Sequence, residues 1–297
     1  MSPVTDRVRG VLSPVAASGK IVHERVPASE PLCGVVQHFW SVRWDLRGAK
    51  PFVPETLPHP NVHWVFEAEG ARIVSVHTGR FTTRLQDRGW VFGVKFRPGA
   101  FQPYFGRSVA SLRDRSVPIG EVFGTKGAAL ARKVADLSDA GKAAAVERFL
   151  NERKIPSDPN VELVGSIVDE IAENREIVSV DQVVEQRRLG KRTLQQLFNS
   201  YVGVGPKWVI NRYRLHEAVE RLQAGSPVSF TELAMELGYF DQAHLIRDFR
   251  KLVGCTPAAY MRRHRRTRSR THPTRLDGIE SDGLTTPQAD AFSRCKS

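Results

Sequence analysis

The spacing of apolar positions divides the chain into a strand-like front part and a helical rear part. Between residues 20 and 125, short runs rich in Val, Phe and Trp end at Gly or Pro, which is the pattern of strands. Within "VFGVKF", the residues Phe92, Val94 and Phe96 are expected to face opposite to Val91, Gly93 and Lys95. Several such strands in succession predict a β-rich domain of sandwich or barrel-like form.

From residue 126 the apolar positions follow a helical period. Two helices are expected within 126–153, and the Pro- and Asp-punctuated segment "KIPSDPN" then marks a linker. A further apolar stripe predicts the first helix of a second domain, and its members are Val161, Val164, Ile167, Val168 and Ile171. The expected fold class is therefore α+β with two domains. The expected divisions are an N-terminal extension (1–19), a β-rich domain with C-terminal helices (20–153), the linker (154–160), a helical domain (161–263) and a basic, disordered tail (264–297).

One short pattern occurs twice in the helical part. "RTLQQLFNSYVGVGP" (192–206) and "HLIRDFRKLVGCTP" (244–257) share Leu, Phe, Gly and Pro at the same spacings. Each copy follows a shorter helical pattern that begins after a serine, Ser179 or Ser229, which is a residue type suited to capping a helix N-terminus. The Gly suits a helix that ends in the left-handed conformation, and the Pro suits the exit of the chain. The repeat thus predicts two helix-turn-helix units.

The segment between the copies predicts a rigid connection. "GPKWVINRYRLHEAVERLQAG" (205–225) has the apolar spacing of one long helix. Because the second helix of such a unit enters a DNA major groove, a stiff connector would set two recognition helices about one turn of DNA, ~34 Å, apart. Two ordinary helical hairpins are the alternative. Against it, the outward positions of both second helices carry hydrogen-bonding types where a solvated face more often carries Glu and Lys pairs.

The charge of the chain indicates a polyanionic partner. The 297 residues hold 44 Lys+Arg and 32 Asp+Glu, which gives a net charge of +12 and a pI near 10.0. Residues 175–268 hold 17 Lys+Arg and 9 Asp+Glu, so most of the excess lies where the repeat is. Nucleic acid and an acidic membrane surface both fit, and a basic protein without such a partner is the alternative.

Other composition signals favour a soluble protein of the cytoplasm. No stretch approaches the ~18 consecutive apolar residues of a membrane span, and the N-terminal residues lack the apolar core of a signal peptide. Cys33, Cys255 and Cys295 lie far apart without a CxxC pair. This spacing favours a reducing compartment over a disulfide framework or a zinc site.

The repeat region, roughly residues 160–263, resembles the DNA-binding domain of the AraC/XylS transcriptional regulators. "ELAMELGYFDQAHLIRDFRKLVGCTPAAYMR" (232–262) is similar to the family signature nearly position for position. The resemblance implies a regulator, an activator in the first place with repression left open, that binds double-stranded promoter DNA through two recognition helices in successive major grooves. Base contacts are implied for Arg192, Thr193, Gln195, Gln196, Gln242, His244 and Arg247. Phosphate contacts are expected from Lys191, Lys207, Arg212, Arg250 and Lys251.

The first unit departs from the family pattern at two positions. Val184 stands where a small Ala is usual, which is expected to open the angle between the two helices slightly. Arg188 stands where a turn Gly is usual, and Gly190 is expected to take over the positive φ.

The front part resembles a β-rich domain of poorly defined role that precedes this module in some family members, through "LPHPNVHWVFE" (57–67) and "GVKFRPGAFQPYFG" (93–106). By domain order it is expected to bind a small-molecule effector, to form a homodimer, or both, and contact with RNA polymerase is a further expectation. No cofactor and no metal are expected, because His59 and His63 flank Pro60 and do not converge. The strand aromatics either line an apolar pocket or form the core, and they are Trp40, Trp44, Trp64, Trp90, Phe92, Phe96 and Phe101.

Two other functions stay open. One is an enzyme or thiol-reactive sensor fused to a DNA-binding module. It needs an activated cysteine, and Cys33 has Glu30 close by but no clear base. The other is an RNA-binding or chromatin-compacting basic protein, which would bind without sequence preference. Because no catalytic triad order, phosphate loop or paired-carboxylate motif stands out, we do not expect an enzyme.

Overall fold

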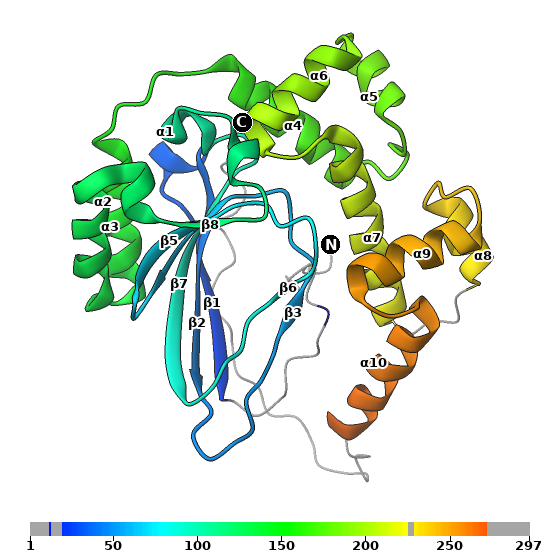
Figure 1. Ribbon diagram of the computed structural model, residues 1–297, viewed down its shortest axis with the longest axis horizontal. Helices are drawn as coiled ribbons and strands as arrows, with labels where there is room; N and C mark the ends of the chain where they lie inside the picture. The colour runs from blue at the N-terminus through cyan, green and yellow to red at the C-terminus, as the bar shows by residue number, and fades with distance from the viewer. Residues whose placement is uncertain (1–11, 13–19, 225–228, 272–297) are drawn as a thin grey trace, which may run out of the picture.

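The computed structural model describes residues 12, 20–224 and 229–271, and it confirms a β-rich front part followed by a helical rear part (Figure 1). The strands are β1 (Ile21–Val26), β2 (Val36–Asp45), β3 (Glu55–Thr56), β4 (His63–Glu67), β5 (Gly70–Val74), β6 (Phe81–Thr82), β7 (Arg88–Phe96) and β8 (Ser116–Pro118). The helices of the front part are α1 (Gln102–Phe105), α2 (Ile119–Ala135) and α3 (Asp139–Asn151), with short 3-10 turns η1 (Glu30–Leu32) and η2 (Val109–Leu112). The rear part holds α4 (Pro159–Glu173), α5 (Val180–Arg187), α6 (Lys191–Leu197), a π-helical turn η3 (Phe198–Val202), α7 (Pro206–Ala224), α8 (Phe230–Glu236), α9 (Gln242–Val253) and α10 (Pro257–Thr271).

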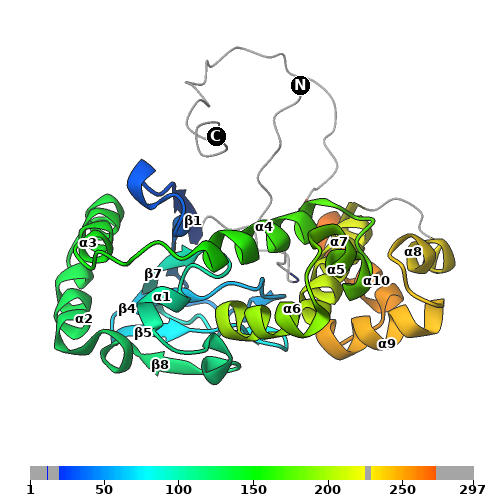
Figure 2. The same ribbon diagram turned by 90° about the horizontal axis from the view of Figure 1, so that it is seen from above.

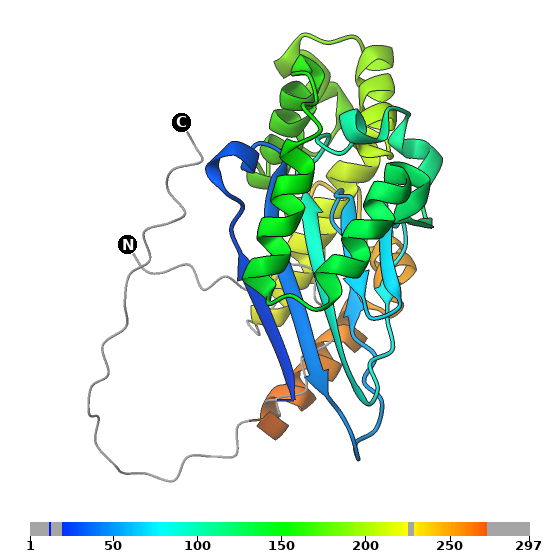
Figure 3. The same ribbon diagram turned by 90° about the vertical axis from the view of Figure 1, so that its left-hand side faces the viewer.

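The front part is built on one six-stranded antiparallel sheet with the order β1-β2-β7-β4-β5-β8. Strands β3 and β6 pair separately as a short ribbon. In place of a second large sheet, α2 and α3 cover one face of the six-stranded sheet (Figures 1 and 3). The other face is directed away from these two helices, toward the ribbon and the rear part (Figure 1).

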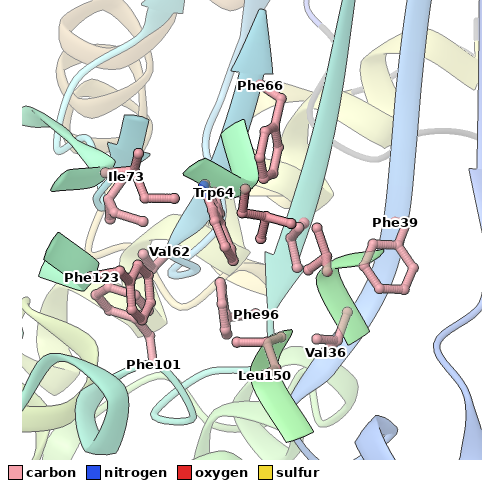
Figure 4. Packing of buried hydrophobic residues seen from close by; sticks show 14 of the residues in the cluster. Val36, Phe39, Val62, Trp64, Phe66, Ile73, Phe96, Phe101, Phe123 and Leu150 are labelled. Atoms are coloured by element: carbon pink, nitrogen blue, oxygen red, sulfur yellow. The ribbon is translucent and has the colours of Figure 1, made fainter. Parts of the chain in front are cut away.

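The core of the front part lies between the sheet and the helices α2 and α3 (Figure 4). The expected alternation in β7 is confirmed, since Phe92, Val94 and Phe96 are buried in this cluster. The indole of Trp64 stacks on Phe123 of α2 with the ring centroids 5.1 Å apart. Of the aromatic residues that the sequence offered as pocket or core, four belong to the core, and they are Trp64, Phe92, Phe96 and Phe101.

The rear part packs around two hydrophobic clusters joined by α7. One cluster unites α4, α5, α6 and the first half of α7, and the other unites the second half of α7 with α8, α9 and α10. With 19 residues, α7 is about 28 Å long. The connector expected from the sequence is thus one continuous helix.

Helix α10 differs from the expected tail. It continues to Thr271, so residues 264–271 are helical where a disordered tail was expected. Pro257 fits its first turn, and the buried ring of Tyr260 packs edge-on against Phe249, which anchors its start. The remainder of that tail, and the N-terminal extension apart from Leu12, lie outside the described residues. Among the helices that the structure describes, none is long and apolar enough to cross a bilayer.

Candidate nucleic-acid interface

Each repeat copy folds as two helices with a capped start. In the first unit, Ser179 caps α5 in a capping box, because its Oγ accepts from the Gln182 backbone N–H at 3.3 Å while the Gln182 side chain accepts from the Ser179 N–H at 2.9 Å. In the second unit, the Ser229 Oγ accepts from the Glu232 N–H at 3.3 Å and starts α8. Both serines therefore have the N-cap role that the sequence predicts.

The second helix of each unit is held by one apolar stripe. Leu194 and Phe198 in the first unit, and Leu245 and Phe249 in the second, are completely buried. Because one face of each helix is fixed inward, the polar positions must face outward. Helices α6 and α9 lie along the same side of the helical part, at the lower edge of Figure 2.

Helix α6, the expected recognition helix of the first unit, has an exposed polar surface. Five side chains at its start are exposed, and they are Lys191, Arg192, Thr193, Gln195 and Gln196. The Nζ of Lys191 lies 2.6 Å from a carboxylate oxygen of Asp181, but both side chains are largely exposed, so this pair is easily exchanged for a phosphate.

Helix α9, the expected recognition helix of the second unit, makes more contacts with its own unit through its polar side chains. Arg247 is exposed and has no hydrogen bond or salt bridge to another residue in the part of the chain described. Gln242 is half-buried and accepts a hydrogen bond from the Thr231 hydroxyl at 2.9 Å. His244 is also half-buried, with its ring edge-on to Tyr239 at 5.1 Å between centroids. Of these three base-contact candidates, only Arg247 is fully available without rearrangement.

The expected phosphate contact of Arg212 is wrong for this structure. Lys207, Arg250 and Lys251 are exposed, as that role requires, but Arg212 is only 1% exposed. Its guanidinium stacks on Trp208 at 4.4 Å and donates to the carbonyl of Thr78 in the front part at 2.6 Å. Burial lowers the pKa of Arg212 to about 10, so it stays charged at neutral pH. Its face of α7 packs on the front domain, a contact that a helical repeat by itself does not reveal.

The turn of the first unit also differs from the expectation. Arg188 itself adopts the left-handed conformation with φ of 50°, while Gly190 has φ of −65° and lies at the N-cap of α6. In the second unit the equivalent residue is Gly238, with φ of 67°. The N–H groups of Arg188 and Leu189 donate to carbonyls of the last turn of α5, and this way of ending a helix requires a left-handed residue at position 188. Arg188 therefore adopts a positive φ although an arginine disfavours it.

Two family models match separate parts of the chain. A family model described as "Helix-turn-helix domain" matches residues 184–263, which hold both units apart from the start of α5. Residues 184–263 are a helix-turn-helix domain of the AraC type. A second model, described as "Domain of unknown function (DUF6597)", matches residues 24–118, which contain nearly the whole six-stranded sheet.

Similar curated proteins match over about a quarter of this chain. The HTH-type transcriptional regulator ExsA of Pseudomonas aeruginosa is 34% identical over 71 residues, which are 24% of this chain and 25% of ExsA. The thermoregulatory protein LcrF of Yersinia pestis is 31% identical over 70 residues, 24% of this chain and 26% of LcrF. The match thus spans about a quarter of the length of these relatives. A solved structure of ToxT from Vibrio cholerae is 11% identical, covers 82% of this chain and 98% of ToxT, and has a TM-score of 0.34, which establishes no shared domain arrangement.

The AraC-type domain has an exposed apolar residue that the sequence analysis did not single out. Phe240 lies directly before Asp241, the N-cap of α9, and is 92% exposed. Met235 of α8 is 69% exposed. The available signal was the spacing of the two helix starts in each unit. From one N-cap to the next it is 11 residues in the first unit (Ser179 to Gly190) and 12 in the second (Ser229 to Asp241), and Phe240 lies in this longer turn.

Two arginines of the front part donate hydrogen bonds to the C-terminal ends of η3 and α9. The sequence did not indicate these contacts. Arg113 donates through Nε to the carbonyl of Gly203 at 2.7 Å, and Arg80 donates to the carbonyl of Val253 at 3.1 Å. These carbonyls end η3 and α9, where a helix presents unpaired acceptors and partial negative charge. The front domain therefore contacts both units of the AraC-type domain in the same way.

The sites proposed for other chemistry do not assemble. Cys255 is half-buried, and burial raises the pKa of its thiol, opposite to the activation of a reactive cysteine. The backbone carbonyl of Cys33 accepts from Arg97, and its sulfur is free. His59 stacks on His216 of α7 with 4.2 Å between centroids, whereas His63 lies on β4. Within residues 12, 20–224 and 229–271, no three His, Cys, Asp or Glu side chains are grouped as a metal site requires.

Proposed function

We propose that the protein is a sequence-specific, DNA-binding regulator of transcription. The observation that carries the proposal is the pairing of two helix-turn-helix units on one 19-residue helix, with helices α6 and α9 on the same side of the helical part. Among the similar proteins, ExsA is named a transcriptional regulator, and LcrF is named a thermoregulatory protein. We infer that α6 and α9 enter successive major grooves of one duplex.

The proposed contacts fall into two groups. Exposed lysines and arginines at the helix ends, Lys191, Lys207, Arg250 and Lys251, would neutralise phosphates, so their contribution to affinity falls as salt concentration rises. Arg192, Thr193, Gln195 and Gln196 on α6, and Arg247 on α9, would distinguish base pairs. Gln242 and His244 join them if the Thr231 hydroxyl and the ring of Tyr239 release them on binding.

The front domain is proposed as the regulatory part. Its arginines Arg80 and Arg113 bind the two units at corresponding places, and Arg212 of α7 donates to its Thr78. A change in the front domain, such as effector binding, would therefore reach both recognition helices. A homodimer, contact with RNA polymerase and the direction of regulation stay predictions.

Selection of bound sites from a pool of random duplexes tests the proposal. We expect two enriched boxes whose centres are about one helical turn, roughly 10 base pairs, apart. Enrichment without any shared sequence would contradict a specific regulator and favour a basic protein that compacts nucleic acid. A single box would contradict the simultaneous use of α6 and α9.

A further inference from the structure

Three basic side chains form one row on the face of the sheet that α2 and α3 leave uncovered. Lys95 lies on β7, between β2 and β4 in the sheet. The strand register places His38 of β2 directly opposite Lys95 on one side and His63 of β4 directly opposite on the other. Directly opposed residues of antiparallel strands project from the same face and lie within ~5.5 Å at their Cα atoms. All three side chains are half-buried.

Among residues 12, 20–224 and 229–271, no acidic side chain pairs with this row. The charged groups that face it from β1 are Arg25 and His23, which lie opposite Trp40 and Val42 of β2. The carboxylates nearest along these strands, Glu24 and Glu67, each pair with an arginine elsewhere, at 2.7 and 2.8 Å. Lys95 itself has no hydrogen bond or salt bridge to any other described residue. An ammonium withdrawn from water without a counter-ion is unfavourable, so an anion bound beside Lys95 would stabilise its charge.

The protonation states of the three side chains are consistent with a site for an anion beside Lys95. Burial, followed by the charge of Arg25, lowers the pKa of Lys95 to about 8. Burial and the positive neighbours lower the pKa of His38 and of His63 to about 3. At neutral pH the histidines are therefore neutral, and Lys95 supplies the charge. An anion placed beside Lys95 would raise the pKa of its ammonium again.

An aromatic surface lies next to the ammonium. Two residues before Lys95 on β7, Gly93 lies under the indole of Trp40, and a Cβ at Gly93 would come within 2.0 Å of that ring. The indole N–H donates to Nδ1 of His63 at 3.3 Å, so His63 must carry its proton on Nε2. This arrangement holds the half-exposed Trp40 ring in place and leaves the Nε2–H of His63 as a hydrogen-bond donor that Trp40 does not use.

We propose that the row of His38, Lys95 and His63 is a binding site for a small organic carboxylate whose apolar or aromatic body packs on Trp40. A metal ion does not fit, because His38 and His63 are two strands apart, about 10 Å, with the ammonium between them. In the proposed regulator, this site would bind the effector. Only this regulatory role rests on the proposed function. Carboxylate binding itself does not depend on it.

Benzoate is the probe for the test, with benzamide as a neutral molecule of the same shape. The full-length protein is titrated and the indole N–H signal of Trp40 is followed by NMR, after assignment with Trp40→Phe. We expect saturable movement of this signal at millimolar benzoate and binding of benzamide weaker by about tenfold or more, because the charge-assisted contact is lost. Affinity for benzoate should be present below the pKa of Lys95 and fall as the pH rises above it.

Two variants decide between the site and unspecific attraction. Lys95→Met removes the ammonium while keeping the length of the side chain, and we expect benzoate affinity to drop about tenfold or more. Lys126→Met removes an exposed charge from α2, on the other side of the sheet, and should leave the affinity unchanged. Equal binding of benzoate and benzamide, equal binding by both variants, or a Trp40 signal that stays still would each overturn the proposal. DNA-site selection is measured separately, so a failure of either idea leaves the other standing.

Discussion

The two helix-turn-helix units share a plan but differ in how they present it. Both begin at a capping serine, bury a Leu and a Phe on the second helix, and end at a glycine with positive φ, 93° at Gly203 and 84° at Gly254. In both, an arginine of the front domain donates to a carbonyl at that end. The shared features all concern folding and attachment.

The differences concern the turn and the surface. Arg188 takes the left-handed position of the first turn, whereas Gly238 takes it in the second. The first recognition helix starts at Gly190 without a side-chain cap, and the second starts at Asp241, whose carboxylate accepts from the His244 N–H at 2.6 Å. Only the second unit exposes Phe240. A duplicated framework thus carries two different contact surfaces, which fits a pair of recognition helices that bind two different sequences.

The largest expected effect separates base recognition from phosphate binding in the two units. Arg247→Ala in the second unit and Arg192→Ala in the first should each weaken binding to a selected site by about 1–3 kcal/mol, which is a factor of about 5 to 150. Binding to scrambled DNA should change much less. Fluorescence anisotropy with both duplexes at one salt concentration measures this.

The matched control for these arginines is Arg250→Ala, an exposed residue one helical turn from Arg247. Loss of one phosphate contact should weaken binding to both duplexes equally. It should also lower the number of counterions released on binding, measured from the salt dependence of the affinity, by about one. If Arg247→Ala behaves in the same way as Arg250→Ala, then Arg247 binds phosphate only, and the second unit does not determine sequence in the proposed manner.

The next effect concerns the turns. Gly238→Ala places a Cβ at φ of 67° and 2.6 Å from a methyl group of Val178, so we expect a loss of about 2 kcal/mol in the free energy of unfolding. Arg188→Gly removes a side chain from the same strained conformation and should change stability by less than about 1 kcal/mol, because relief of strain offsets the added chain entropy. Urea denaturation of the two variants measures both. If Arg188→Gly lost as much stability as Gly238→Ala, the first turn would not favour glycine as the second does, and the two turns would not be equivalent.

The sequence predicted the parts of the molecule that depend on local pattern. The caps Ser179 and Ser229, the continuous helix 206–224 and the buried alternation of β7 all follow from residue type and spacing, and the structure confirms them. These features need only the interactions of neighbours along the chain or of one apolar face.

What the sequence did not predict depends on contacts between distant segments. Arg212 has the residue type of a phosphate contact, but its face of α7 is covered by the front domain, 134 residues away at Thr78. The row around Lys95 exists only because β2, β7 and β4 are neighbours in the sheet, an order that the sequence does not state. Arg188 adopts positive φ because the helix end demands it, against the preference of its type.

A smaller effect tests the attachment of each unit to the front domain. Arg113→Ala should destabilise the first unit, and Arg80→Ala the second, each by up to about 1 kcal/mol, since these side chains are partly exposed. Hydrogen exchange of the amides in η3 and α9 measures the local opening, which should become about fivefold faster in the unit concerned. Arg84→Ala, an exposed arginine of the same front segment, serves as the control and should change neither. Faster exchange in both units from one substitution would show that α7 couples them rigidly.

The smallest expected effect concerns the residue that the second unit has and the first lacks. Phe240 is almost fully exposed, so Phe240→Ala should leave the stability within about 0.5 kcal/mol of the original. It precedes the N-terminus of α9, the end of a recognition helix that comes closest to base edges, and a phenyl ring there can contact the methyl group of thymine. One such methyl is worth about 0.8 kcal/mol, roughly fourfold in affinity.

Uracil in place of thymine in the half-site of the second unit separates this contact from a general loss of affinity. The original protein should lose about fourfold on the uracil duplex, because the ring of Phe240 loses its methyl partner. Phe240→Ala should bind both duplexes equally, at the weaker level. The same replacement in the half-site of the first unit, whose shorter turn has no residue at this place, should leave the effect of Phe240→Ala unchanged. If the variant still distinguishes thymine from uracil in the second half-site, the methyl is contacted by another residue of α9, and the additional residue of the turn has no part in recognition.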